Sequence, residues 1–322
     1  MKEVLTRKQG VLESVLAGLL MAGLLSGNVQ HAGAAESRSA APETEASHEV
    51  EPVQLVKGPL SIAVSPQYGG RITGLSLNGR NLLTQNATDG NNFGSTFWLS
   101  PQSLWNWPPV AAHDSAPYRI TAQDAHTLSM QGPTGAGARV GKSISMLTGN
   151  RARVKYRIEA EQDFDEIAAW EITRVPSRGL AFAPVAMDTV QTVRGSMQYL
   201  QDAAGVLWLP MDNRAQHKEG KIIANGSEGW LAYAVDGLLY LKVYPKIDAE
   251  EMATGEGDIE LYLSGVKPYL ELEVQSAAQA LTQGEVLDWS VEWLLLPIPG
   301  DVEVHSGSRS LLDFAREQVS AL

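Results

Sequence analysis

An all-β fold of antiparallel strands is the fold class that the sequence predicts. Between residue 53 and about residue 300, about fifteen short segments alternate apolar and polar side chains, which is the period-2 pattern of β-strands. Asn78-Gly79 has the composition of a type I′ hairpin turn. Helical periodicity is limited to residues 310–319. The sequence therefore predicts a large antiparallel sandwich with one short C-terminal helix packed on its outside.

Residues 1–35 have the organisation of a secretory signal peptide. Basic side chains come first, an apolar run covers residues 15–25, and Ala32-Gly33-Ala34 resembles a cleavage site. The run is too short to cross a bilayer, which needs about 20 residues, although an uncleaved membrane anchor is the alternative. Residues 36–52 are small, polar and acidic, which predicts a disordered linker. We therefore expect a periplasmic or secreted domain over residues 53–322, without membrane contact once the signal is removed.

The composition of the chain argues against several classes of partner, metal site and ligand. The formal net charge is −12 and the chain has no cysteine. The negative charge disfavours nucleic acid as a partner, and the lack of cysteine excludes disulfides and thiolate zinc sites. The six histidines are not spaced as metal ligands, and no Gly-x-Ser-x-Gly motif occurs. We expect no metal or other cofactor and a neutral ligand, and the sequence indicates no oligomeric state.

The first predicted strands form a meander. Residues 60–64 and 71–77 alternate on either side of Tyr68-Gly69-Gly70, and residues 80–83 follow the Asn78-Gly79 turn. Further segments with strand alternation cover residues 118–122, 127–131, 142–147, 152–160, 167–175, 185–193, 206–209, 230–234, 238–244, 259–263, 269–275 and 286–296. In the predicted helix, one apolar face contains Leu311, Leu312, Phe314 and Ala315.

Residues 93–109 combine tryptophans with prolines. Trp98, Trp105 and Trp107 stand among Pro101, Pro108 and Pro109, which forbid a regular helix and predict a stiff extended loop. An indole ring suits the apolar face of a sugar, and a neighbouring amide such as Gln102 suits its hydroxyls. The alternative interpretation is that the rings plug the end of the sheet core.

Two predicted strands carry candidate polar groups. In residues 269–275, alternation places Tyr269, Glu271, Glu273 and Gln275 on one face, which is either exposed to solvent or the floor of a concave site. Two adjacent carboxylates could raise the pKa of one of them and supply a general base. In residues 170–174, Trp170 and Arg174 share a face, as core-rim packing or as sugar contacts.

His113 follows the tryptophan segment and precedes Asp114. A neutral histidine there could donate a proton to a substrate oxygen, whereas the alternative is an exposed loop histidine. His217 and Lys218, in a polar stretch, are the substitutes if His113 points elsewhere.

Four stretches of the chain resemble the galactose mutarotase-like (aldose 1-epimerase-like) β-supersandwich proteins, in particular an exported bacterial branch. These stretches are Gly69-Gly-Arg-Ile-Thr-Gly-Leu-Ser-Leu-Asn-Gly-Arg-Asn-Leu-Leu83, the segment from Phe97 to Pro109, Gly229-Trp-Leu-Ala-Tyr233 and Leu272-Glu-Val-Gln275. The resemblance covers residues 53 to about 300 and implies an antiparallel β-supersandwich. Aldose epimerases end on a similar Leu-Glu-x-Gln, whose glutamate takes the proton from the anomeric hydroxyl. The resemblance therefore implies that Glu273 is a general base.

The family's two histidine motifs, Leu-His-Gly and His-x-Tyr-Phe, do not occur here. Trp170 stands near the position of the second motif, and the tryptophan segment replaces the first. Two functions are therefore expected as alternatives: an isomerase acting at an anomeric centre, with Glu273 as base and His113 as acid, or a glycan-recognition module without catalysis. A third is an interaction scaffold without a ligand. The expected saccharide-binding residues are Arg71, Trp98, Gln102, Trp105, Trp107, Arg174 and Glu271.

Overall fold

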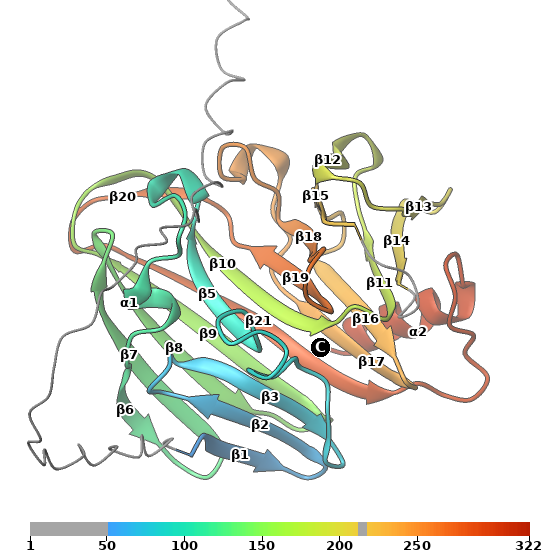
Figure 1. Cartoon of the computed structure of the whole chain (residues 1–322), viewed down its shortest axis with the longest axis horizontal. Helices are drawn as coiled ribbons and strands as arrows, with labels where there is room; N and C mark the ends of the chain where they lie inside the picture. Colours follow the sequence, from blue (N-terminus) through green and yellow to red (C-terminus); the bar gives the residue numbers. More distant parts are fainter. Residues whose placement is uncertain (1–50, 212–217) are drawn as a thin grey trace, which may run out of the picture. The chain divides into compact units, whose positions relative to one another are not determined.

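The computed structural model describes residues 51–211 and 218–322. The expected signal peptide and nearly all of the expected linker therefore lie outside the described residues. The described chain forms two antiparallel β-sheets, named here sheet A and sheet B, with a helix near the C-terminus (Figure 1). The predicted antiparallel sandwich with a short C-terminal helix is confirmed.

Both sheets combine pairs of consecutive strands with pairs of strands that are distant in the sequence. Sheet A has 11 strands, in the spatial order β1 (Val53–Lys57), β2 (Leu60–Ser65), β3 (Arg71–Leu77), β5 (Ser95–Ser100), β10 (Phe164–Pro176), β19 (Tyr269–Gln275), β18 (Ile259–Leu263), β15 (Gly220–Ala224) and β12 (Gln191–Gly195), with β4 (Arg80–Asn81) on β3 and β20 (Gln279–Leu281) on β10. Sheet B has 10 strands, in the order β13 (Leu200–Gln201), β14 (Val206–Met211), β11 (Gly179–Pro184), β16 (Trp230–Val235), β17 (Leu238–Val243), β21 (Val286–Pro297), β9 (Arg151–Ala160), β8 (Ala138–Met146), β7 (Thr127–Gly135) and β6 (Arg119–Gln123). The helical elements are η1 (Gln102–Leu104), α1 (Ala111–Asp114), η2 (Met187–Thr189), η3 (Ala249–Glu251) and α2 (Arg309–Ser320).

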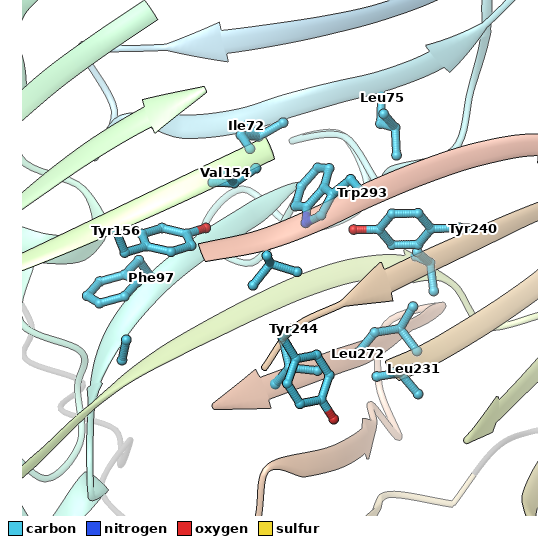
Figure 2. Packing of buried hydrophobic residues seen from close by; sticks show 14 of the residues in the cluster. Ile72, Leu75, Phe97, Val154, Tyr156, Leu231, Tyr240, Tyr244, Leu272 and Trp293 are labelled. Atoms are coloured by element: carbon cyan, nitrogen blue, oxygen red, sulfur yellow. The ribbon is translucent and has the colours of Figure 1, made fainter. Parts of the chain in front are cut away.

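Large apolar side chains of both sheets interlock between them (Figure 2). Phe97 of β5 stacks on Tyr156 of β9 with ring centroids 4.5 Å apart, so the contact joins sheet A to sheet B. Tyr240 and Trp293 meet edge to face at 5.5 Å. Burial of such rings is the main favourable term in folding, which allows a domain of this size to hold together without cysteine.

One ion pair is buried within this core. Glu171 of β10 and Lys242 of β17 lie 3.0 Å apart, and neither side chain is exposed. Glu171 also accepts hydrogen bonds from Tyr156 Oη at 2.7 Å and Trp293 Nε1 at 3.0 Å. Lys242 donates to Leu272 O at 2.7 Å. The pair therefore ties β10 and β19 of sheet A to β17, β9 and β21 of sheet B.

Helix α2 covers the outer face of sheet B. The Ser308 hydroxyl caps its first turn by accepting from Leu311 N at 3.2 Å. Leu311, Leu312 and Ala315 pack into an apolar cluster with the outward side chains of β11, β14 and β16, among them Phe182, Trp208 and Trp230. The helix therefore covers the part of the outer face of sheet B that β11, β14 and β16 form.

The segment from residue 93 to residue 109 is not one extended loop, as the prolines had suggested. Its first part is strand β5, in which Phe97 and Leu99 enter the core between the sheets and Trp98 points to the other side. The prolines act only from Pro101 onward, where the strand ends and η1 begins. Alternation within β5 thus decides which tryptophan faces outward.

Because of Asp258, immediately before β18, we expect the free energy of unfolding to depend on pH. This buried carboxylate accepts from Gly226 N at 2.6 Å and from Tyr244 Oη at 3.1 Å. Burial raises its pKa from 3.8 to about 6, although both hydrogen bonds oppose the rise. Between these two pH values the folded state holds a proton that the unfolded state has released, so the contribution of Asp258 to stability falls as pH rises from about 4 to 6 and does not change further above that.

We expect Asp258→Asn to remove this loss. Relative to the variant, the free energy of unfolding of the wild type should drop by roughly 2–3 kcal/mol between pH 4 and pH 7, since one pKa unit is worth about 1.4 kcal/mol. Urea unfolding at a series of pH values measures the difference. Parallel pH curves for the two proteins would contradict the assignment.

Candidate functional site

The outer face of sheet A carries the polar residues that the alternation of β19 had predicted. Leu270, Leu272 and Val274 enter the core, so Tyr269, Glu271, Glu273 and Gln275 point to the outer side. The register aligns Glu273 with Ile172 of β10 and with Glu260 of β18. Every residue of β19 is buried. The face is therefore neither a plain solvated surface nor an apolar core.

Lys221 links two of the carboxylates on this face. Its Nζ atom forms an ion pair with Glu260 and lies 3.5 Å from Glu273 Oε2. Gln275 Nε2 donates to Glu260 Oε1 at 2.8 Å. The Lys221 ammonium also lies 4.9 Å from the centroid of the Trp170 ring. We call Lys221, Glu260, Glu273 and Gln275 the lysine cluster.

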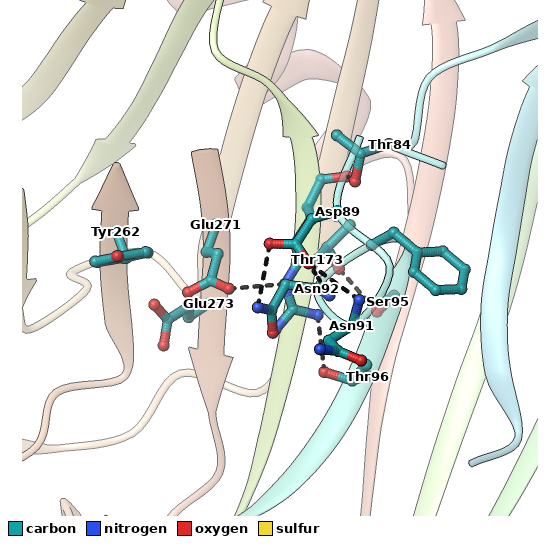
Figure 3. Close-up of polar contacts among 12 residues, drawn as sticks. Thr84, Asp89, Asn91, Asn92, Ser95, Thr96, Thr173, Tyr262, Glu271 and Glu273 are labelled. Carbon is teal, nitrogen blue, oxygen red and sulfur yellow. Dashed lines mark hydrogen bonds and ion pairs between the residues drawn. The ribbon is translucent and has the colours of Figure 1, made fainter. Parts of the chain in front are cut away.

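Arg174 of β10 forms the neighbouring pair. Its Nε atom donates to Glu271 Oε1 at 2.7 Å, and its Nη1 atom donates to Thr96 Oγ1 of β5 at 3.2 Å. Its guanidinium carbon lies 5.6 Å from the Trp98 ring. Figure 3 shows the Glu271 and Glu273 carboxylates on the same side of β19. The arginine pair and the lysine cluster are therefore parts of one face.

Several buried polar atoms of this face have no hydrogen-bond partner among the described residues. They include both carboxylate oxygens of Glu273, Nη2 of Arg174, Nε1 of Trp170 and Oε2 of Glu260, the last of which is ion-paired with Lys221. Glu273 is only 1% exposed. A buried polar atom left without a partner costs about 1–3 kcal/mol, so native proteins rarely retain several in one place without a reason. The group offers acceptors and donors together, as a ligand with hydroxyl groups requires.

The charges of this face shift one another's pKa values. Burial raises the pKa of Glu271 to about 7, with Arg174 opposing the rise and Glu273 adding to it. Burial likewise raises the pKa of Glu260 well above its ordinary value, against the attraction of Lys221. For Lys221, burial lowers the pKa, but the carboxylates of Glu260 and Glu273 outweigh it and the net direction is upward. A carboxyl group that titrates near neutral pH is suited to proton transfer.

The three tryptophans of the 98–107 segment form an aromatic cluster at the edge of this face. Trp98 meets Trp105, Trp107 and Trp170 edge to face, with centroid distances of 5.6, 6.3 and 5.4 Å. The Trp98 Nε1 atom donates to Asp114 Oδ1 at 2.9 Å, and Trp105 Nε1 donates to Leu99 O at 2.8 Å. Only Trp107 remains largely in solvent, at 64% exposure.

Arg71 was expected to contact a saccharide, but its side chain is fully buried within the protein. Its Nη1 atom donates to Asn91 O at 2.7 Å and Phe93 O at 3.1 Å, and its Nη2 atom pairs with Asp114 Oδ2 at 3.2 Å. The guanidinium lies against the rings of Tyr68 and Phe93. Arg71 therefore links the backbone around Asn91 and Phe93 to α1, and its predicted role in saccharide binding stays a prediction.

His113 was expected to serve as the acid partner of Glu273, but the structure does not bring the two together. The imidazole is 1% exposed, and its Nε2 atom lies 3.3 Å from Ala138 O of β8 in sheet B. Burial lowers its pKa to about 4, with the hydrogen bond to Ala138 opposing. His113 is thus a neutral core residue. The substitute His217 lies outside the described residues, and Lys218 is exposed.

The structure adds two residues that the sequence argument had missed. Lys221 and Glu260 lie on β15 and β18, where Ile222 and Leu261 enter the core and their neighbours face outward. Alternation within each strand was the available signal for Lys221 and Glu260, but it does not reveal which strands are neighbours.

The predicted site residue Gln102 is half-buried, and its backbone N–H donates to Glu256 Oε1 at 2.9 Å.

A comparison with known protein families shows to which family the chain belongs. Residues 50–296 match the family described as a domain of unknown function, DUF4380. The chain belongs to the DUF4380 family. The matched range contains every strand of the outer face described above, so the lysine cluster and the arginine pair lie within the DUF4380 domain. No curated protein matches the chain.

Solved structures resemble this DUF4380 domain in fold. The Slr1438 protein from Synechocystis is 14% identical, with a TM-score of 0.54 over 76% of this chain and 96% of that one. The galactose mutarotase related enzyme from Lactobacillus acidophilus is 6% identical, with a TM-score of 0.52 over 79% of this chain and 100% of that one. At such identities the likeness concerns the fold alone. The DUF4380 domain has the galactose mutarotase-like fold that the sequence resemblance implied.

Residues 51–211 and 218–322 contain neither a membrane-spanning helix nor a metal-binding cluster. No helix there is long and apolar enough to span a membrane. No group of three or more histidine, aspartate or glutamate side chains in the same ranges could hold a metal ion.

Proposed function

We propose that this DUF4380 domain binds a neutral saccharide on the outer face of sheet A. The observation that carries the proposal is the Glu273 carboxylate, which is buried while neither oxygen accepts a hydrogen bond. Sugar hydroxyls can donate to Glu273 and accept from Arg174 Nη2 and Trp170 Nε1. A ligand with hydroxyls therefore satisfies atoms that have no hydrogen-bond partner among the described residues, although Glu273 Oε2 also lies 3.5 Å from the Lys221 ammonium.

The charge of the site favours a neutral sugar. Three carboxyl groups, those of Glu260, Glu271 and Glu273, face two cations, Arg174 and Lys221, and each cation is already paired with one of them. An anionic sugar would add charge of the same sign as the carboxylates, which disfavours binding. We further propose that the protein acts in the periplasm or is secreted, on the pattern of residues 1–35 alone.

An array of neutral mono-, di- and tetrasaccharides tests the binding. Arg174→Lys keeps a cation beside Glu271 but removes the free Nη2 donor and the planar guanidinium. We expect this variant to bind its best glycan about tenfold more weakly than the wild type, which corresponds to one hydrogen bond of about 1.4 kcal/mol. The change Glu285→Gln, at an exposed carboxylate, is the control. The proposal fails if the wild type binds no saccharide.

A second candidate function is isomerisation at an anomeric centre. It is favoured by two carboxyl groups on one face of β19, of which Glu271 has a pKa raised to about 7. Glu273 takes the proton from the anomeric hydroxyl, and Glu271 in its protonated form gives a proton to the ring oxygen. The bond between the anomeric carbon and the ring oxygen breaks, and reclosure on the opposite face returns both protons. Glu271 thus takes the role expected of His113, which is buried elsewhere.

A further inference from the structure

In the aromatic cluster, three tryptophan rings are packed within the protein and one ring is exposed to solvent. Trp98 is buried and donates its indole N–H to Asp114, and Trp105 is half-buried and donates to Leu99 O. Trp170 is fully buried beneath the same cluster. Trp107 is 64% exposed, so it alone among these rings offers a broad surface to solvent.

Exposure of a tryptophan at this position is costly without a partner. Trp is among the largest apolar side chains, and each Å² of apolar surface left in water forgoes about 25 cal/mol. The ring is nevertheless held in place, because it meets Trp98 edge to face at 6.3 Å and the stiff Pro108-Pro109 pair follows it. A fixed, exposed indole beside a polar site is suited to stack on a sugar ring.

Trp107 is separated from the free polar atoms by the Trp98 ring. Trp107 lies 6.3 Å from Trp98, and Trp98 lies 5.6 Å from the Arg174 guanidinium and 5.4 Å from Trp170. Each step is comparable with the width of one pyranose ring. A sugar that satisfies Glu273 and Arg174 therefore leaves Trp107 uncovered, and a second unit is needed to reach it.

We propose that the ligand is an oligosaccharide of at least two units, one in the polar site around Glu273 and Arg174 and the next stacked on Trp107. This inference rests on the proposed saccharide binding. It assigns the substrate class, because a free monosaccharide would use only the first position. It also assigns Trp107 as a specificity-determining residue that discriminates by chain length rather than by the sugar in the polar site.

Titration calorimetry with the best tetrasaccharide from the array and with its constituent monosaccharides tests the inference. We expect the wild type to bind the tetrasaccharide more tightly, and Trp107→Ala to weaken that binding about tenfold while leaving monosaccharide binding unchanged. Trp107→Tyr, which restores a flat aromatic face, should recover most of the affinity. Val304→Ala removes an exposed apolar side chain in the segment before α2 and serves as the control.

The outcomes separate the two proposals. If Trp107→Ala leaves tetrasaccharide binding unchanged, or weakens both ligands equally, the second position is refuted while the polar site stands. If the wild type binds monosaccharides and tetrasaccharides with equal affinity, the second position is also refuted. If the wild type binds neither ligand, the proposed function itself fails, and the inference fails with it.

Discussion

Lys242→Met is expected to lower the free energy of unfolding by about 3–5 kcal/mol, the range measured when one partner of a buried ion pair is removed. The methionine side chain occupies a similar volume, so packing changes little. The loss comes from Glu171, which keeps its hydrogen bonds from Tyr156 and Trp293 but loses its cation in a site where neither side chain is exposed. Burial already lowers the pKa of Lys242, against the attraction of Glu171.

A second variant distinguishes the loss of the cation from a general packing defect as the cause of the destabilisation. Glu171→Gln combined with Lys242→Met removes both charges but keeps a side-chain oxygen that can accept from Tyr156 or Trp293. We expect the double variant to recover at least half of the lost stability, because an uncompensated buried charge costs more than a neutral polar group. Urea unfolding of the wild type, the single variant and the double variant measures this recovery. A single variant that loses less than about 1 kcal/mol, the range of exposed ion pairs, would show that Glu171 does not depend on Lys242.

The fold could be predicted because one local pattern repeats in most strands. In β19, alternation placed Glu271 and Glu273 on the face opposite Leu270 and Leu272, and the structure agrees. Whether that face is exposed to solvent or buried could not be predicted. It depends on which strands flank β19, and these are β10 and β18, of which β10 is about one hundred residues away in the sequence.

Sequence proximity was a poor guide to the site for the same reason. His113 and Asp114 are adjacent, yet Asp114 accepts from Trp98 while His113 contacts Ala138 of the opposite sheet. Neighbouring residues of a helical turn point about 100° apart, since a turn has 3.6 residues. Lys221, in contrast, lies 52 positions before Glu273 and still reaches it, because β15, β18 and β19 are consecutive in sheet A.

Arg71 has a side chain that could bind a saccharide, but its hydrogen bonds hold segments of the protein together. Gly69 has φ +69°, and a Cβ atom there would stand 2.0 Å from Asp114 O, so the turn before Arg71 packs directly on α1. The guanidinium that follows then meets the backbone carbonyls of residues 91 and 93 rather than solvent. Arg71 and Arg174 each keep one buried nitrogen without a hydrogen-bond partner, Nε and Nη2 respectively, so only the three-dimensional packing shows that Arg174 lies beside Glu271 on the outer face of sheet A.

Glu273→Gln is expected to decide whether the domain catalyses anomeric exchange. The amide keeps the size of the side chain but cannot take a proton, so the rate above buffer should fall by about 10²–10⁴-fold, the usual contribution of a general base. Saturation-transfer NMR between the two anomers of a reducing sugar measures the rate directly. Because Lys221 retains Glu260 as an ion-pair partner, we expect the variant to fold.

Two further variants make the result specific to proton transfer. Glu271→Gln removes the group whose pKa is raised to about 7, so it should also slow the exchange and abolish the fall in rate that we expect for the wild type as pH rises through 7. Glu285→Gln makes the same change at an exposed carboxylate and should leave the rate unaltered. If Glu273→Gln exchanged anomers as fast as the wild type, Glu273 would not be the base. If the wild type bound sugars without accelerating their exchange, the buried carboxylate would serve recognition alone, as an acceptor for the hydroxyl that an epimerase deprotonates.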